Sequence, residues 1–389
     1  MSKPLDGLKI LDFTYLLPGP YGTMLLADLG ADIIKVENSE APDMMRMMPP
    51  YVDDMSAVYS HVNRGKKSLS INLKNPEALE IIRRLVREYD VVVEQFRPGT
   101  MERLHIGYEQ LAKVNPSIIY CSLTGYGQTG SYAGRAGHDI NYMAVSGVES
   151  MSGRKETGPV LTGIQVADIA SGSKNLAIGV MAAYIGRSRT GKGDYIDVSI
   201  TDGVFSMSVF MTAGYLAGGK EPVRGDLLSG GALYDFYATS DGGYLSVGPV
   251  EQKFFSAFCE CIGCQDIVAT GIMNWNHKER VAKIIASKPL SHWREVFRQC
   301  DACVEPVYSV SEAIASPPLS ERDMIVQVKT HAGKQARQIG NPIKFKSGHY
   351  CASSGGAILG FHNEEILSNL GFSRDDICRL RDAGVIGQL

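Results

Sequence analysis

The 389-residue sequence has no long apolar run, no large excess of either charge and no apolar segment at its start. Its longest apolar stretch, near residues 176–186, is about half of the roughly 20 residues that a membrane-spanning helix needs. Met1–Asp6 contains no signal-like segment, so we do not expect export. The 42 acidic residues outnumber the 39 basic ones by three, without a basic block. We therefore expect a cytoplasmic protein with neither a membrane nor a nucleic acid as partner.

Cysteine is sparse as well, with eight residues in the whole chain. Such a low number is typical of reduced thiols and does not indicate a disulfide framework. Cys259, Cys261 and Cys264, together with Cys300 and Cys303, would supply enough thiolates for a metal. However, the apolar residues around the first three recur at helical spacing, and free cysteine behaves as a small buried hydrophobe. We therefore expect core thiols and no metal site.

The composition that is present, 44% hydrophobic and 21% charged residues, is typical of a globular protein of two or three domains. In the first half, short apolar runs alternate with helical patterns, which predicts an α/β fold with a parallel sheet covered by helices. We expect strands at residues 8–13, 32–36, 91–96, 117–123 and 195–200. We expect helices at residues 21–29, 75–89, 169–187 and 204–216.

Two changes in composition suggest domain boundaries. Residues 217–231 are rich in glycine and contain Pro222, and Pro317-Pro318 marks a second crossing. Between them, Asp241-Gly242-Gly243 predicts a β-hairpin that is followed by two or three helices. We predict a large domain over residues 1–220, a smaller α+β domain over 221–330 and a C-terminal segment, 331–389, that returns to the large domain.

Open parallel sheets bind ligands at the carboxyl ends of their strands. The loops over residues 14–20, 97–99 and 124–130 would meet at that edge. The third contains Gly125-x-Gly127-x-x-Gly130, which matches a dinucleotide-binding pattern but does not open a helix. We therefore interpret it as a glycine-rich turn close to some ligand.

Basic residues form a compact turn at Asn63–Lys67, and Arg97 stands at a strand end. A charge cluster is usually a solvated surface. Alternatively, Arg64, Lys66, Lys67 and Arg97 anchor a multiply phosphorylated ligand.

Three polar residues stand out near predicted helix starts. His138 and Asp139 fall where a loop meets a helix, and Asp168 lies in the apolar run 164–169. Either aspartate could simply cap its helix. Partial loss of water near a positive helix end would instead leave Asp168 ionised and poorly hydrated, which suits a nucleophile or a base.

At these residues the sequence resembles the class III CoA-transferase family, which also contains the α-methylacyl-CoA racemases. The resemblance covers essentially the whole chain. It implies a Rossmann-like large domain built from both chain ends, a smaller domain between them, and two subunits interlocked like chain links. The motifs that carry the resemblance are Pro4-Leu5-Asp6-Gly7, Ala27-Asp28-Leu29-Gly30-Ala31-Asp32, Asn72-Leu73-Lys74, Phe96-Arg97-Pro98-Gly99, Thr124-Gly125-Tyr126-Gly127-Gln128, Gly137-His138-Asp139, Thr190-Gly191-Lys192-Gly193 and Asp301-Ala302-Cys303.

The resemblance also implies the ligands. An acyl-CoA and a carboxylic acid would be the substrates, with coenzyme A as a thioester and no tightly bound cofactor or metal. CoA would bind on the large domain, and the chemistry would take place at the domain and subunit interface of an interlocked homodimer or of a heterodimer with a related subunit. We expect CoA contacts from Arg64, Lys66, Lys67, Arg97, Tyr126, Gly127, Asp139 and Tyr142.

Two reactions are known in such a family. In the transferases, an aspartate that matches Asp168 attacks the thioester, and a mixed anhydride and an aspartyl-CoA thioester follow. In the racemases, residues that match His138 and Asp168 exchange the α-proton through an enolate, and a glutamate that matches Glu251 assists. One base must stand on each face of the α-carbon.

The sequence mixes features of both branches. His138, Glu251 and Ser229–Ala232 resemble the racemases. Ile169–Ser173 replaces a run of glycines that racemases have, and Leu161–Gly163 resembles the transferases. Since these differences lie next to the reacting carboxylate, we favour a transferase over a racemase.

Residues 13–20 further resemble transferases that act on succinate-like or aryl-succinate acids. A catalytically silent subunit of a heteromer is a third alternative, although the presence of Asp168 counts against it.

Overall fold

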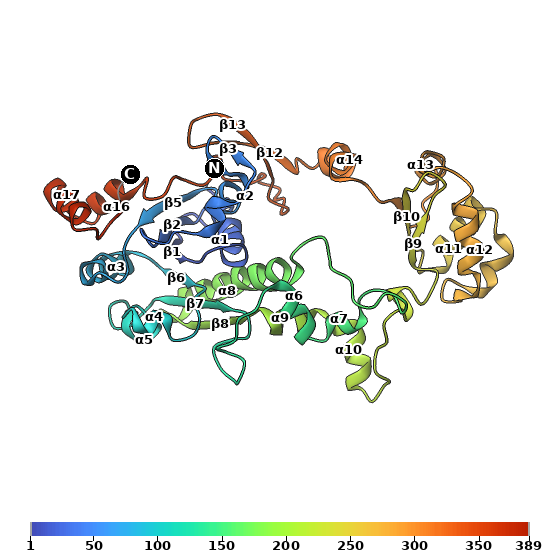
Figure 1. Cartoon of the computed structure of the whole chain (residues 1–389), viewed down its shortest axis with the longest axis horizontal. Helices are drawn as coiled ribbons and strands as arrows, with labels where there is room; N and C mark the ends of the chain where they lie inside the picture. The colour runs from blue at the N-terminus through green and yellow to red at the C-terminus, as the bar shows by residue number, and fades with distance from the viewer. Residues whose placement is uncertain (1, 388–389) are drawn as a thin grey trace. The chain divides into compact units, whose positions relative to one another are not determined.

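The computed structural model describes residues 2–387. The chain divides into two compact units (Figure 1). Unit 1 comprises Met1–Val145, Gly163–Ser206 and Pro317–Leu389, and unit 2 comprises Ser146–Thr162 and Met207–Ser316. Both ends of the chain therefore contribute to unit 1.

The boundaries differ from those predicted. Unit 2 starts at Met207 instead of 221, ends at Ser316 instead of 330, and includes Ser146–Thr162. The single helix expected at 204–216 is two helices, and the second of them has no buried residue. The chain leaves unit 1 at the last turn of the first helix, so the glycine-rich stretch lies inside unit 2.

Unit 1 contains a six-stranded parallel sheet with the strand order β5-β2-β1-β6-β7-β8. This sheet confirms the α/β prediction. Its inner strands are buried on both faces and are rich in apolar residues, as in Val91–Val93 of the Val91–Glu94 strand, although several also carry a buried charge. The strands are β1 (Lys9–Phe13), β2 (Asp32–Glu37), β5 (Lys66–Ser70), β6 (Val91–Glu94), β7 (Ile119–Thr124) and β8 (Tyr195–Ser199).

Helices cover both faces of this sheet. Leu11 and Phe13 pack into a core shared with α3, α16 and α17, whereas Asp12, on the other face of the same strand, accepts a hydrogen bond from Thr23 of α1, and α1 packs against α8. Asn75 caps α3 through its side chain and Pro76 occupies the first turn, as the sequence predicts. The main helices are α1 (Pro18–Asp28), α3 (Pro76–Glu88), α8 (Lys174–Thr190), α9 (Ile200–Met207), α16 (Asn363–Asn369) and α17 (Arg374–Asp382).

Shorter elements complete unit 1. No helix within residues 2–387 is both long and apolar enough to cross a lipid bilayer. The short elements are β3 (Tyr51–Val52), β4 (Met55–Ser56), α2 (Ala57–Val62), α4 (Thr100–Arg103), α5 (Tyr108–Leu111), α6 (Asp139–Val145), α15 (Pro317–Ser320), β12 (Ile325–Lys329) and β13 (Gln335–Ile339).

Unit 2 has a three-stranded antiparallel sheet with the order β11-β10-β9, and its β9–β10 hairpin confirms the turn predicted at residues 241–243. Phe255, Phe258 and Trp293 form its core together with the buried thiols of Cys259 and Cys264. The elements are α7 (Val148–Met151), α10 (Val209–Leu216), β9 (Asp235–Ala238), β10 (Tyr244–Val247), α11 (Gln252–Cys261), α12 (Lys278–Ile285), α13 (Leu290–Arg298), β11 (Val304–Pro306) and α14 (Val310–Ala315).

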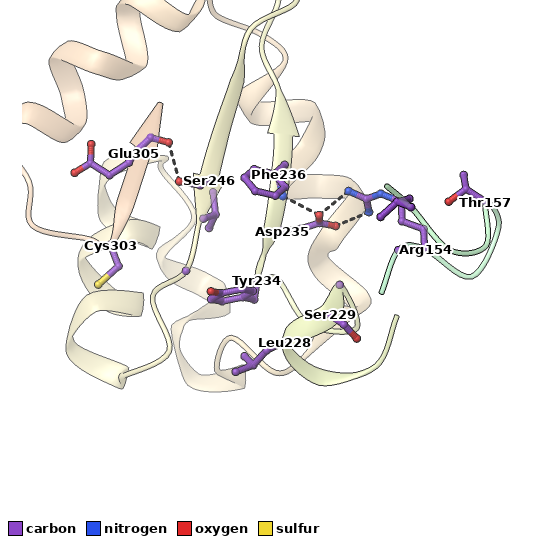
Figure 2. Close-up of a pocket in the computed structure, with 15 residues that line it drawn as sticks. Arg154, Thr157, Leu228, Ser229, Tyr234, Asp235, Phe236, Ser246, Cys303 and Glu305 are labelled. Carbon is purple, nitrogen blue, oxygen red and sulfur yellow. Dashed lines mark hydrogen bonds and ion pairs between the residues drawn. The ribbon is translucent and has the colours of Figure 1, made fainter. Parts of the chain in front are cut away.

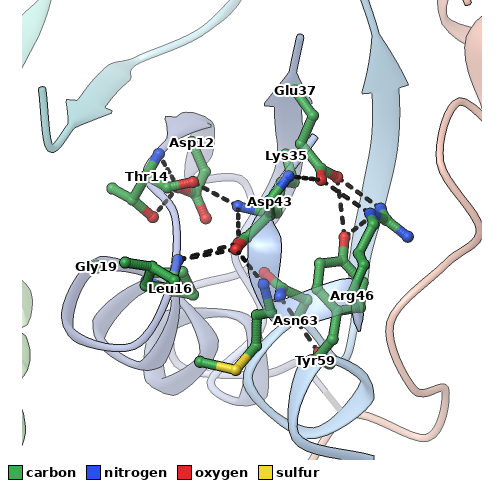
Figure 3. A network of polar contacts seen from close by, with 12 residues as sticks. Asp12, Thr14, Leu16, Gly19, Lys35, Glu37, Asp43, Arg46, Tyr59 and Asn63 are labelled. Atoms are coloured by element: carbon green, nitrogen blue, oxygen red, sulfur yellow. Dashed lines mark hydrogen bonds and ion pairs between the residues drawn. The ribbon is translucent and has the colours of Figure 1, made fainter. Parts of the chain in front are cut away.

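A network of buried charges lies at β1, β2 and the segment that follows β2 (Figure 3). Lys35 on β2 bonds to Asp43 at 3.3 Å, and Arg46 forms an ion pair of 2.6 Å with Glu37. Tyr59 donates a hydrogen bond of 2.9 Å to the same Glu37 carboxylate. Each buried charge has a partner of opposite sign, as burial in a medium of low dielectric constant requires.

Candidate active site

A cavity of about 270 Å³ lies at the carboxyl ends of β1, β6 and β7. Residues from all three loops expected at this edge line it, and every lining residue belongs to unit 1. The lining residues at these strand ends are Tyr15–Pro18, Gln95–Pro98 and Leu123–Gly125, and Asp168, His138 and Tyr142 line the same cavity.

Asp168 lies in a π-helical segment, Ala167–Ser173, that leads into α8. Such turns widen the backbone and are frequent at functional sites. The Asp168 side chain does not cap the helix, because Val166 stands at the cap position and no side chain bonds there. The capping role considered from the sequence is therefore wrong.

Two serines hold this segment in place. The Ser173 hydroxyl donates to the Pro18 carbonyl at 2.6 Å, and the Ser171 hydroxyl donates to the Ile200 carbonyl at 2.6 Å. Gly172 lies between these serines, and a side chain at this position would be crowded, since its Cβ would lie 3.1 Å from Ile200. The run that replaces the racemase glycines thus fixes the backbone that carries Asp168.

The surroundings of Asp168 raise its pKa to about 6. Burial is the main cause, and the nearby negative charge of Asp139 adds to it. The Asp139 carboxylate accepts a hydrogen bond of 3.0 Å from the Asp168 backbone N–H, which holds the two acids close together. Within residues 2–387, no cation forms an ion pair with Asp168. It is therefore a partly dehydrated carboxylate that remains mostly ionised at neutral pH.

His138 is exposed and lines the same cavity as Asp168. Its backbone N–H donates to the Asn141 side chain at 3.0 Å, which shapes the start of α6. The Tyr142 hydroxyl donates to the Gly137 carbonyl at 2.6 Å and fixes the loop before His138. A side chain on Gly125 would overlap the Tyr142 ring, so this close approach requires glycine.

The remaining predicted ligand residues of this region differ in how close they lie to the cavity. Arg97 is exposed and lines it. The Tyr126 ring stands edge-on to Tyr142 with centroids 5.3 Å apart. Gly127 has a φ of +80°, which the glycine-rich turn after β7 requires. The fold thus brings Arg97, His138, Tyr142 and Asp168 together around one cavity. Tyr126 and Asp139 contact residues of its wall, and Gly127 is not among the lining residues.

The exposed basic turn predicted at Asn63–Lys67 is wrong. Arg64 is fully buried and forms a two-pronged ion pair with Asp28 at 2.9 and 2.6 Å. Lys66 starts strand β5 and its ammonium lies 3.0 Å from the Asp12 carboxylate. Buried acids neutralise both cations, so Arg64 and Lys66 are not available to bind the CoA phosphates. Lys67 is partly exposed and pairs with Glu365 at 3.1 Å.

Glu251 belongs to unit 2, where it is exposed and directly precedes α11. It is not among the residues of the Asp168 cavity, all of which belong to unit 1. Its assisting role stays a prediction.

Two further residues at the end of β6 shape the site, and the sequence patterns did not single them out as candidates. Gln95 accepts a hydrogen bond of 2.9 Å from the Gly19 backbone and so ties β6 to the start of α1. Glu94 is buried, and burial raises its pKa to about 7. Its carboxylate accepts a 2.7 Å hydrogen bond from Phe96 and thereby sets the direction of the loop that carries Arg97. The signal in the sequence was a glutamate that ends an all-valine strand.

An open parallel sheet with a cavity at the carboxyl ends of its strands is the architecture of α/β ligand-binding proteins. The sequence matches CoA-transferase family III over residues 5–363. It is 34% identical to the alpha-methylacyl-CoA racemase of Homo sapiens over 388 residues, which cover 98% of this chain and 97% of that protein. It is 33% identical to the succinyl-CoA:glutarate CoA-transferase of Homo sapiens over 398 residues, which cover 99% of this chain and 90% of that protein.

A solved structure agrees with these matches. The crystal structure of a CAIB/BAIF family protein from Brucella suis superposes with a TM-score of 0.84 and 30% sequence identity, and the match covers 95% of this chain and 100% of that one. The chain belongs to CoA-transferase family III.

Proposed function

We propose that the chain is a CoA-transferase that moves CoA from an acyl-CoA donor to a carboxylic acid by way of a covalent intermediate on Asp168. The observation that carries this proposal is a partly buried carboxylate with a pKa of about 6 that lines a cavity and makes no ion pair with any residue in 2–387. Such a carboxylate loses little hydration when it attacks and is ionised at neutral pH.

The reaction would proceed through successive acyl transfers, in each of which one bond forms at the acyl carbon and another breaks. An Asp168 oxygen attacks the donor thioester, and CoA leaves as a thiolate with formation of a mixed anhydride. The thiolate then attacks the Asp168 carbonyl, which releases the donor acid and leaves an aspartyl-CoA thioester. The acceptor carboxylate displaces CoA again to form a second anhydride. Thiolate attack on the acceptor carbonyl gives the new thioester and free Asp168.

The remaining residues of the cavity would bind and orient the substrates. Arg97 has an exposed guanidinium and makes no ion pair with another residue in 2–387, so it would hold a CoA phosphate. His138 lines the cavity with Asp168 and would orient or polarise the thioester carbonyl. Asp139 would act through Asp168 by holding its backbone and raising its pKa.

The second candidate is an α-methylacyl-CoA racemase. The observation that favours it is that His138 and Asp168 line the same cavity, since racemisation needs two bases at one substrate. The 34% identity to a racemase also supports it. The segment after Asp168 is held in place by the hydrogen bonds of Ser171 and Ser173 and stands where racemases have glycines. This difference favours the transferase.

One experiment separates the two reactions. The protein is mixed with several acyl-CoAs and free acids in deuterated buffer, and the masses of the CoA esters are followed. Movement of CoA to the second acid without deuterium in the donor supports the transferase. Deuterium at the α-carbon without exchange of the acyl group contradicts it and establishes the racemase.

A further inference from the structure

The loop between β1 and α1 has a strained backbone at the cavity of Asp168. Leu16 has a φ of +59°, a left-handed conformation that residues other than glycine rarely adopt. Such strain persists only where the surrounding structure holds it, and it is concentrated at functional sites. Tyr15–Pro18, which includes Leu16, lines the cavity together with Asp168. The contacts that hold Leu16 therefore decide the shape of this part of the wall.

The Asp43 carboxylate holds Leu16 from outside the cavity. It accepts the Leu16 N–H at 3.0 and 3.1 Å, one distance to each carboxylate oxygen. The same carboxylate accepts the Met45 N–H at 3.0 Å and so caps the 3-10 helix Met44–Met47. The Asp43 side chain is fully buried and is not among the residues that line the cavity. It can therefore place the loop without touching a substrate.

Lys35 adds a second bond to the same loop. Figure 3 shows the Asp43 carboxylate between Leu16 and Lys35, whose ammonium lies 3.3 Å from it. The Lys35 ammonium also donates to the Thr14 carbonyl, and the Thr14 N–H donates to Asp12 at 2.9 Å. The residues on both sides of Tyr15 are thus bonded to buried charges, and these bonds form without a ligand.

The loop also contacts the segment that carries Asp168. Two positions after Leu16, the Pro18 carbonyl accepts the Ser173 hydroxyl at 2.6 Å. The same hydroxyl lies 3.0 Å from the Asp168 carbonyl oxygen. A shift of Leu16 would therefore reach both the wall of the cavity and the backbone of Asp168. A misplacement of about 1 Å at a reacting group can lower a rate about 100-fold.

Asp235 of unit 2 shows how Asp43 differs from other paired acids (Figure 2). Asp235 lines a cavity of about 860 Å³ and accepts hydrogen bonds of 2.7 and 2.6 Å from Arg154. It also accepts the N–H of Phe236, its neighbour in the sequence, at 2.7 Å. Asp43 instead accepts a backbone N–H from a residue 27 positions away that has a left-handed φ. A backbone bond over such a separation fixes how one loop lies relative to another element.

We propose that Asp43 is a positioning residue for the reaction at Asp168. Its carboxylate keeps Leu16 in the left-handed conformation and thereby places residues 14–18 at the cavity and beside the Asp168 segment. The inference rests on the proposed function, because it requires a reaction at Asp168. It adds to that function a residue that neither touches the substrate nor lines the cavity.

The test measures kcat and KM for CoA transfer in variants of the full chain. Asp43→Asn keeps an oxygen that can accept the Leu16 N–H, Asp43→Ala keeps none, and both lose the charge beside Lys35. We expect kcat to fall about tenfold in Asp43→Asn and about 100-fold in Asp43→Ala. KM for the acyl-CoA should change less than about threefold, since Glu94 holds the Arg97 loop separately.

Glycine at position 16 gives the decisive comparison. Glycine adopts the left-handed conformation without strain, so the loop would depend less on Asp43. In the Leu16→Gly background, Asp43→Asn should therefore lower kcat less than about threefold, against about tenfold in the wild type. Leu16 itself lines the cavity, and comparing variants within each background removes the effect of losing its side chain.

Asp28→Asn is the matched control. Asp28 is also a fully buried acid of unit 1, where it pairs with Arg64 and accepts the Ala352 N–H at 2.9 Å. Neither Asp28 nor Ala352 lines the cavity, and the 11 residues of α1 place Asp28 roughly 16 Å from the start of that helix. Asp28→Asn should keep the wild-type kcat. Thermal unfolding of Asp28→Asn and Asp43→Asn checks that both are folded at the assay temperature.

The proposal is overturned if Asp43→Asn keeps the wild-type kcat or loses no more than Asp28→Asn. It is also overturned if Asp43→Asn and Asp43→Ala are equally slow, or if Leu16→Gly does not reduce the effect of Asp43→Asn. Failure of the proposed function differs, because the wild type itself would then move no CoA. Hydrogen exchange decides in that case: the Leu16 amide should exchange faster in Asp43→Asn than in Asp28→Asn, and equal rates would overturn the proposal.

Discussion

Asp168 and Asp12 show how the surroundings of a carboxyl group decide its role. Burial alone would raise the pKa of Asp12, but Lys66 and Lys35 beside it lower that pKa to about 2. Asp168 is also partly buried, yet its charged neighbour is an acid, and its pKa rises to about 6. Paired charges stabilise a fold, whereas an unpaired carboxylate at a cavity is available for chemistry.

Replacing the Asp168 carboxylate should abolish CoA exchange. We expect Asp168→Asn to reduce the rate by at least 1,000-fold, on the order of ~4 kcal/mol of barrier, because an amide cannot form an anhydride. The steady-state rate with an acyl-CoA and a free acid measures this. Asp382→Asn, a change at an exposed acid in α17, is the control and should leave the rate unchanged. Retention of more than about a tenth of the rate in Asp168→Asn would exclude a covalent role.

The pH dependence follows from the same carboxyl group. The nucleophile must be ionised, so kcat/KM should rise with pH through a midpoint near 6. Asp139→Asn removes one of the two causes of the raised pKa and should move this midpoint lower. A pH–rate profile of both proteins tests the shift. A wild-type midpoint near the ordinary aspartate value, or no movement in Asp139→Asn, would contradict this account.

At the scale of elements, the periodic segments were predictable and β5 was not. Helix α3 has a capping asparagine, a proline in its first turn and a clear apolar face, and all of these are local signals. Strand β5 consists of Lys66–Ser70, which has no apolar alternation. It is completed by residues nearly 300 positions away, since His362 and Asn363 accept hydrogen bonds from its Ser68 and Ser70 N–H groups. No local pattern reveals such partners.

The residues of the candidate site also fall into those that the sequence could predict and those that it could not. The loops after the strands, Asp168 and His138 could be identified from their positions in the sequence. The burial of Arg64 and Lys66 could not, because it depends on Asp28 and Asp12, which come from other elements. Ser146–Thr162 likewise joins unit 2 through the Arg154–Asp235 pair, which links residues 81 positions apart.

Breaking the buried pair of Lys66 and Asp12 should destabilise unit 1 strongly. We expect Lys66→Met to cost about 3–5 kcal/mol, because Asp12 would keep a buried charge that has lost its nearest cation. Adding Asp12→Asn should recover part of this loss. Urea unfolding measures both, and Arg280→Gln, at an exposed and solvent-screened pair, should leave the stability almost unchanged. A Lys66→Met protein as stable as this control would contradict the pairing.

At the scale of the whole molecule, helix α10 leaves apolar side chains in water. Phe210 and Leu216 are 69% and 74% exposed, and α10 contains no buried residue. Exposed apolar patches of this kind mark interaction surfaces. We predict that the chain associates with a second copy through this helix. Sedimentation should give twice the 42.2 kDa mass of the chain, and Phe210→Glu should lower it. A monomer at micromolar concentration, or an unchanged mass in Phe210→Glu, would contradict this prediction.

The central claim is that Asp168 carries the acyl group and then CoA, and trapping the intermediate tests it most directly. Hydroxylamine is added during turnover with an acyl-CoA donor, and the peptide that contains Asp168 is analysed by mass spectrometry. The account predicts a hydroxamate on Asp168 that requires the donor and persists in His138→Ala, which retains the nucleophile. Absence of this adduct in a wild-type protein that exchanges the α-hydrogen of the same substrate with solvent would contradict it.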